Sequence, residues 1–183
     1  DIESINYNLG SGDDRVIVKS ADSSMVTTIH GNGGDDTFTL TDDANLMGNI
    51  NGLVNLYGDD GFDIINLDNS GTTTADGRIS NTQIDGFGLG EYITYFGADL
   101  INVLFGSGND ELSVVGLFTA SALAASGGTG SNARKALHVS AGEGDDTIEI
   151  GATDTNRVGL LDGEDTNIGT NSIWGDVVVD AGG

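Results

Sequence analysis

The chain has 183 residues, among them 30 glycines but neither proline nor cysteine. Its formal net charge of -23, from 29 Asp and Glu against 6 Lys and Arg, argues against nucleic acids and anionic membranes as partners and favours cations. No apolar run approaches the roughly 20 residues that cross a bilayer. Without cysteine there are no disulfides and no thiolate metal sites.

Segments that alternate apolar and polar residues occur in pairs, with a glycine- and aspartate-rich turn between the two members of each pair. Alternation with period two predicts a strand with one buried face. In chain order the pairs are 4–9 and 15–18, 26–30 and 37–40, 52–56 and 64–67, 100–105 and 111–114, and 136–140 and 147–150. The predicted unit is a strand, a turn, a second strand and a return segment of variable length.

The five turns align on one aspartate. They read LGSGDDRVIV, NGGDDTFTL, DDGFDIINL, FGSGNDELSV and GEGDDTIEI. In each, glycine stands two residues before the aligned aspartate, and apolar residues stand two and four residues after it. The aligned aspartates are Asp14, Asp36, Asp63, Asp110 and Asp146.

The spacing of these turns predicts a repetitive architecture. Asp14 and Asp36 are 22 residues apart, and periods of about 20 to 50 residues are typical of solenoids, whose repeats bury their apolar faces by stacking. We therefore predict an all-β fold, a right-handed parallel β-solenoid (β-helix or β-roll) of about 22 residues per coil, with the Gly-Asp turns on one edge. A hairpin sandwich is the competing fold; the constant strand order and the absence of proline favour the solenoid.

The sequence also contains a longer repeat, which spans several of the short units. Residues 1–18 match residues 97–114 at a constant offset of 96, including the GSG of both turns. We expect one continuous segment over 1–183 that holds two partial copies of a larger unit, about 1–96 and 97–183. The small, polar, glycine-rich stretch at 119–135 is expected to be an inserted loop.

Stacked carboxylates are the feature that points to a cation. Equivalent positions in neighbouring parallel strands lie ~4.8 Å apart, where two carboxylates repel by roughly 3 to 4 kcal/mol at an effective dielectric of ~20. Calcium would reverse this, because it takes six to eight hard oxygen ligands in a tolerant geometry; zinc would need histidine or cysteine, and only His30 and His138 are present. The candidate metal-binding residues are the aligned Asp14, Asp36, Asp63, Asp110 and Asp146, their neighbours Asp13, Asp35, Asp60, Asn109 and Asp145, and the turn glycines Gly12, Gly34, Gly61, Gly108 and Gly144, whose carbonyls would complete the ligand shell.

The turns resemble the calcium-binding nonapeptides GGxGxDxUx of the RTX, or hemolysin-type, repeat family, in which U is a large apolar residue. Val16, Phe38, Ile65, Leu112 and Ile148 fall on U. The resemblance implies a parallel β-roll with several calcium ions held between turns, in an extracellular or cell-surface protein. Family repeats run back to back, whereas this chain has one motif per coil. Residues 81–110 also resemble a segment that recurs in very large repetitive bacterial surface proteins.

These patterns predict a structural and noncatalytic role, as a calcium-stabilised segment of an extracellular stalk, fibre or adhesin. Because neither end looks capped, we expect end-to-end self-association or covalent continuation. The alternative is a module of a secreted carbohydrate-active enzyme, in which paired carboxylates such as Asp59 and Asp63 act as acid and base. Catalysis needs one singular constellation, and here every acidic cluster is a copy of another, so the structural role is favoured.

Overall fold

Every element of the computed structural model is a strand, within the residues that it describes, which are 3–116, 136–150 and 177–180. Each of the ten segments expected to flank a turn contains a strand. The strands are β1 (Ser4–Gly10), β2 (Arg15–Val18), β3 (Val26–Asn32), β4 (Thr37–Leu40), β5 (Leu53–Tyr57), β6 (Asp63–Asp68), β7 (Asp76–Ile79), β8 (Gln83–Gly86), β9 (Ile93–Phe96), β10 (Ala98–Leu104), β11 (Glu111–Val114), β12 (Ala136–Ser140), β13 (Thr147–Ile150) and β14 (Val177–Asp180).

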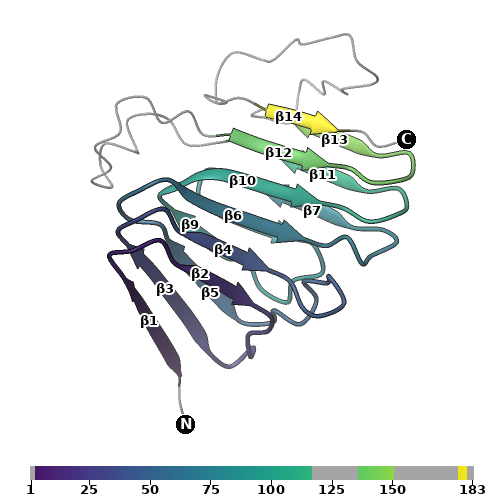
Figure 1. Ribbon diagram of the computed structural model, residues 1–183. Coiled ribbons are helices and arrows are strands. Elements are labelled where there is room, and N and C mark those ends of the chain that lie inside the picture. The colour runs from purple at the N-terminus through teal and green to yellow at the C-terminus, as the bar shows by residue number, and fades with distance from the viewer. Residues whose placement is uncertain (1–2, 117–135, 151–176, 181–183) are drawn as a thin grey trace.

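The strands form two facing sheets (Figure 1). One sheet has six strands, all parallel, in the order β14-β12-β10-β6-β4-β2. The other has eight strands in the order β1-β3-β5-β9-β8-β7-β11-β13 and is mixed, because β8 runs antiparallel to β7 and β9. Outside the β7-β8-β9 segment, successive described strands alternate between the two sheets.

The predicted parallel β-solenoid is therefore wrong. The strands form two separate sheets, one of them mixed, and do not close into a regular coil. The predicted coil length of about 22 residues is wrong as well, since hydrogen-bonded residues of neighbouring turns are 22, 27 and 36 positions apart. The chain instead doubles back twice within the eight-stranded sheet, through β7, β8 and β9.

A tight turn between β7 and β8 causes this reversal. The backbone N–H of Ser80 donates to the carbonyl of Gln83 over 2.8 Å, and Arg78 pairs across the hairpin with Asp85, with 3.1 Å between Nη1 and Oδ2. Ile79 and Ile84 are register partners, and both are fully buried. Antiparallel pairing thus places the two isoleucines together in the core and leaves the charged pair outside.

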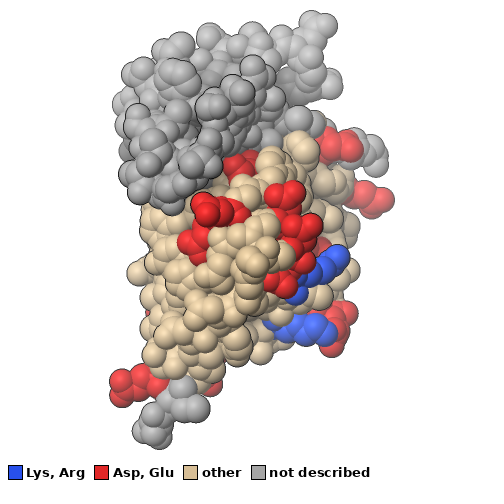
Figure 2. All heavy atoms as spheres, turned by 60° about the vertical axis from the view of Figure 1, so that its left-hand side comes forward, with Lys and Arg blue, Asp and Glu red and all other residues tan. Residues whose placement is uncertain are grey.

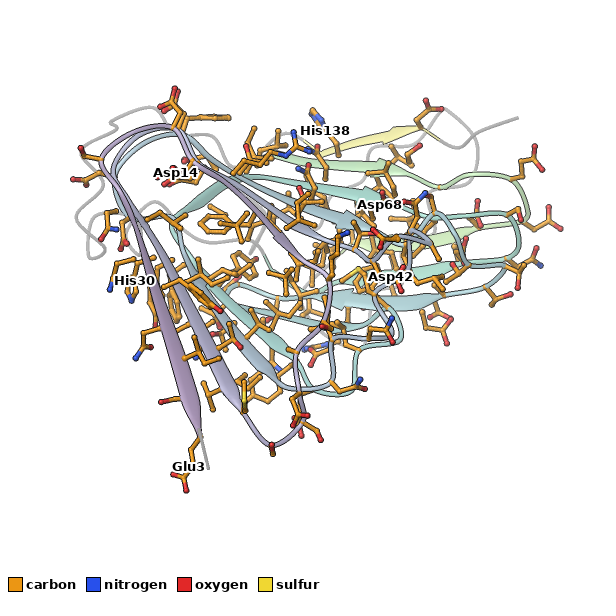
Figure 3. All side chains as sticks on the ribbon, turned by 60° about the horizontal axis from the view of Figure 1, so that its bottom comes forward. Glu3, Asp14, His30, Asp42, Asp68 and His138 are labelled. Atoms are coloured by element: carbon orange, nitrogen blue, oxygen red, sulfur yellow. The ribbon has the colours of Figure 1, made fainter. Side chains whose placement is uncertain are left out.

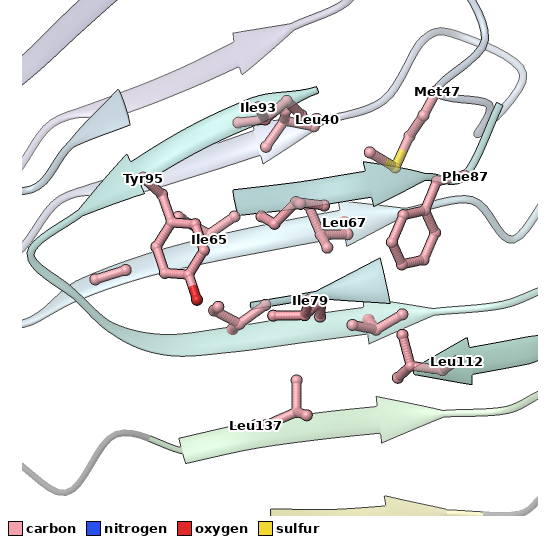
Figure 4. Packing of buried hydrophobic residues seen from close by; sticks show 14 of the residues in the cluster. Leu40, Met47, Ile65, Leu67, Ile79, Phe87, Ile93, Tyr95, Leu112 and Leu137 are labelled. Atoms are coloured by element: carbon pink, nitrogen blue, oxygen red, sulfur yellow. The ribbon is translucent and has the colours of Figure 1, made fainter. Parts of the chain in front are cut away.

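The core lies between the inner faces of the two sheets (Figure 4). Alternate residues of each strand point inward, as the period-two pattern requires. Burying each large apolar side chain contributes about 1.5 to 3 kcal/mol. The six-stranded sheet supplies Phe38, Leu40, Ile65, Leu67, Ile101 and Val103, and the eight-stranded sheet supplies Ile29, Val54, Leu56, Ile93, Tyr95, Leu112 and Val114.

The internal repeat changes sheets between its two copies. The offset of 96 equates β1 with β10, yet β1 belongs to the eight-stranded sheet and β10 to the six-stranded one. The division into copies stays a prediction, and the expected loop at 119–135 lies outside the described residues. Among the residues that are described, no helix is long and apolar enough to cross a membrane.

Candidate functional site

The aspartate turns lie on two opposite edges of the molecule, and the predicted single edge is wrong. Asp14, Asp36 and Asp63 lie where the chain passes from the eight-stranded to the six-stranded sheet. Asp110 and Asp146 lie where it passes back. Figure 1 shows the two groups of turns at its left and right sides.

The first edge carries a continuous row of hydrogen-bonded aspartates, which we call the first aspartate row: Asp14, Asp36, Asp63 and Asp99. The N–H of Asp14 donates to Oδ1 of Asp36 over 2.8 Å, and the N–H of Asp36 donates to Oδ1 of Asp63 over 3.0 Å. The N–H of Asp63 donates to Oδ2 of Asp99 over 3.0 Å. The carboxylates of Asp36, Asp63 and Asp99 therefore each cap the backbone of the turn before.

Asp99 was absent from the predicted set, although its sequence carries the motif. Gly97 stands two residues before it, and Ile101 and Val103 stand two and four residues after it. Gly97 also has positive φ, as four of the five predicted turn glycines do. The missing signal was a second acid, because Ala98 occupies the position where most other turns have Asp or Asn.

The opposite edge carries the second aspartate row, Asp110 and Asp146. The N–H of Ala75 donates to Oδ1 of Asp110 over 2.5 Å, and the N–H of Asp110 donates to Oδ1 of Asp146 over 2.9 Å. Ala75 precedes β7 as the aspartates precede β11 and β13. The second row thus begins at a turn that has Ala75 at the position of the aligned aspartate.

The residues just before the aligned aspartates also link neighbouring turns, but here the N–H of the later turn donates to the side chain of the earlier turn. The N–H of Asp35 donates to Oδ1 of Asp13 over 2.9 Å, and that of Asp145 donates to Oδ1 of Asn109 over 3.0 Å. Asp60 does not make this link through its side chain; its backbone carbonyl accepts from Gly34 over 3.0 Å. Neighbouring turns are therefore tied together by side chains from both sides.

The turn glycines permit very close stacking of the backbone. Gly61 has φ of 139°, a conformation that glycine adopts without penalty, and a Cβ there would collide with the carbonyl of Gly34. Gly34, Gly108 and Gly144 also have positive φ and leave equally little room, whereas a Cβ at Gly12 would meet nothing within 4 Å. Glycine is thus a structural requirement in four of the five predicted turns.

Both aspartate rows contain buried carboxylate oxygens that lack a hydrogen-bond partner. Asp36, Asp63 and Asp110 are almost completely buried. Their Oδ2 atoms, and that of Asp146, are buried without a hydrogen-bond partner. Burial raises the pKa of Asp63 to about 6, assisted by the charges of Asp36 and Asp99. Burial also raises the pKa of Asp36 and of Asp110.

These oxygens fit one side of a hard-cation site. A Cβ at Gly31 or Gly58 would collide with Oδ2 of Asp36 or Asp63 respectively, so these two oxygens pack where only glycine leaves room for them. No group of three or more His, Asp or Glu side chains converges among the described residues as a metal centre would. An ion at these turns would therefore need backbone carbonyls as well as carboxylates, and the same oxygens can alternatively take up a proton.

Other acidic and aromatic residues on the described part of this edge contact one another. Asp59 pairs with His30, whose Nδ1 lies 3.1 Å from Oδ2 of Asp59, while Asp63 is completely buried. The rings of His30, Tyr57 and Phe96 stack on one another at centroid distances of 4.4 and 5.1 Å. The ring faces within this stack therefore cover one another. Figure 2, seen from the side of the first aspartate row, shows how acidic side chains gather on this edge.

No protein-family model, curated protein or solved structure matches this chain. The function is therefore inferred from the geometry and chemistry of the two aspartate rows.

Proposed function

We propose that the chain is a calcium-stabilised structural segment of an extracellular stalk, fibre or adhesin, as its RTX-like turns suggest. The observation that supports this most directly is the set of four buried carboxylate oxygens without a partner, on Asp36, Asp63, Asp110 and Asp146. A buried carboxylate that is not fully paired lowers stability. A cation that binds only the folded chain relieves that cost.

Calcium suits these turns better than the other common divalent ions. It accepts carboxylate and carbonyl oxygens in an irregular shell, whereas magnesium needs a stricter octahedron and zinc prefers nitrogen or sulfur. Asp36 and Asp63 would hold calcium on one edge, and Asp110 and Asp146 on the other. When bound, the ion would supply positive charge between carboxylates that otherwise repel one another.

The repetition of the site supports a structural role. The same turn recurs at different levels of both sheets, and each copy binds the backbone of its neighbour. A net charge of -23 suits a calcium-rich setting such as the extracellular medium. In such a setting the segment would serve as a stiff spacer that associates or continues end to end.

Thermal unfolding of the full chain tests the proposal. Calcium at about 100 times its dissociation constant should add about 2.7 kcal/mol of stability for each independent site. We expect a higher midpoint in millimolar calcium than in excess chelator, and a much smaller rise with magnesium. Identical midpoints with and without calcium would show that the aspartate rows are structural caps only.

A matched pair of variants assigns the effect to the rows. Asp36→Asn keeps an acceptor for the N–H of Asp14 but removes the charge, so it should reduce the calcium-dependent rise. Asp85→Asn removes a charge from a partly exposed pair with Arg78 and should leave the rise unchanged. Equal reductions in both variants would mean that general acidity governs cation binding.

A further inference from the structure

The outermost strands β1 and β2 leave part of the molecule's apolar interior uncovered. They lie at the same end of the two sheets, and no described strand pairs with the outer edge of either. Tyr7 of β1 is 49% exposed, whereas the residues in register with it along the sheet, Ile29, Leu56 and Tyr95, are 2%, 1% and 1% exposed. The first level of the core therefore lacks a covering layer among the described residues.

The first aspartate row is incomplete at the same end. Asp36, Asp63 and Asp99 each accept a backbone N–H from the preceding turn. Among the described residues, no N–H occupies the corresponding place beside the carboxylate of Asp14. The end of the molecule is thus short of both apolar cover and one backbone donor.

The internal repeat indicates which segment would cover the outer edges of β1 and β2. The offset of 96 equates Asp14 with Asp110, β1 with β10 and β2 with β11. In the second copy this end is covered, because β10 pairs with β6 and β11 pairs with β7. The N–H of Ala75, between β6 and β7, donates to Asp110. Residues 63–79 therefore cover the level equivalent to β1 and β2.

We propose that the outer edges of β1 and β2 bind a strand–turn–strand segment of the same repeat, with the chemistry of residues 63–79. The segment runs parallel to both strands, places apolar side chains over Tyr7, and donates an N–H to Asp14. This deepens the proposed structural role by naming its partner, but the hydrogen bonds and apolar cover that carry it do not require calcium.

A fused protein tests the inference on the full chain. Residues 63–96 are placed before residue 1, which recreates the junction found at 96 and 97. In chelator, we expect backbone amides of β1 and β2 to exchange with deuterium at least tenfold more slowly than in the parent, and the same peptide fused in scrambled order to have no such effect. Unchanged exchange in β1 and β2 would overturn the inference.

A second measurement distinguishes binding of this segment from binding of a second copy of the chain. The parent is studied over a range of concentrations by sedimentation and by amide exchange. The proposal expects a monomer throughout, in which the β1 amides on the outer edge, away from β3, stay unprotected. Concentration-dependent dimers that protect β1 would show that another copy occupies the edge, and would overturn the inference.

A variant pair tests the apolar part of the contact. Tyr7→Asp should abolish the added protection in the fused protein, because the carboxylate would lie beneath the added segment. Tyr92→Asp, at a similarly exposed tyrosine, is the control and should keep it. Full protection in the Tyr7 variant would contradict the proposed position. Because all arms are run in chelator, failure of the calcium proposal would leave these outcomes unchanged.

Discussion

The backbone N–H of Asp36 donates a hydrogen bond to Oδ1 of Asp63 over 3.0 Å, across 27 positions of the chain. Asp36 and Asp63 thereby each have a structural role that does not depend on an ion. In both residues Oδ1 caps the preceding turn, while the charge and Oδ2 remain available to a proton or a cation. Substitutions can separate these two roles.

The role as a cap predicts different outcomes for two substitutions of Asp63. In chelator, Asp63→Ala should lower the free energy of unfolding by about 1 to 3 kcal/mol, because it leaves the N–H of Asp36 unpaired. Asp63→Asn keeps an acceptor and should stay within about 1 kcal/mol of the parent. Urea unfolding monitored by circular dichroism measures both. Equal losses in the two variants would show that charge, and not the acceptor, is what the turn needs.

The raised pKa of Asp63 predicts how stability depends on pH. In chelator the folded state binds a proton near pH 6, whereas the unfolded carboxyl binds one only near pH 4, so stability should rise as pH falls from 7 towards 4. Two pKa units correspond to at most about 3 kcal/mol. With saturating calcium the sign should reverse, because protons compete with the ion for the carboxylate. Unfolding curves at several pH values check this; parallel profiles with and without calcium would contradict binding at the row.

Two glycines at the same motif position predict contrasting effects of alanine. Gly61→Ala should destabilise the protein by more than about 1 kcal/mol, because it adds a Cβ at positive φ against the carbonyl of Gly34. Gly12→Ala has open space around the added atom and should change stability by less than about 0.5 kcal/mol. Thermal or urea unfolding distinguishes them. Similar losses at both positions would contradict the close stacking of the turns.

The sheet assignment predicts which residues can be cross-linked. Asn66 and Asn102 are register partners, and Nδ2 of Asn102 lies 2.8 Å from Oδ1 of Asn66. Cysteines at these two positions should form a disulfide, since neighbouring parallel strands are ~4.8 Å apart. Asn6 is the equivalent of Asn102 in the internal repeat, but it lies in the other sheet. Cysteines at positions 6 and 102 should therefore not form a disulfide. The absence of native cysteine makes mass spectrometry of the oxidised proteins unambiguous.

The local structure could be predicted from the sequence because it depends on local patterns. Alternation located the strands beside the turns, and alignment on the aspartates brought together Asp14, Asp36 and Asp63, which the structure stacks in one row. The pairing of Asp110 with Asp146 follows in the same way. These residues stack because identical turns joined to parallel strands adopt the same register.

The global arrangement could not be predicted because it depends on where the chain reverses. Ile79 and Ile84 flank a short polar turn, a pattern typical of a hairpin, but the prediction of about 22 residues per coil made no allowance for a reversal there. The number of residues between two motifs does not indicate whether the chain changes sheets between them. The two edges and the mixed sheet were missed for that reason, and Figure 3 shows Asp14 on the edge away from Asp42 and Asp68, whose turns lead back to the eight-stranded sheet.

The β7-β8-β9 reversal also determines curvature. It gives one sheet two more described strands than the other, which at ~4.8 Å per strand makes that sheet about 10 Å longer. Two layers of unequal length joined face to face must arch, with the longer layer on the convex side. A fibre assembled from such units would change direction at every copy of the hairpin, so its path through space would be set by how often residues like 76–96 recur along it.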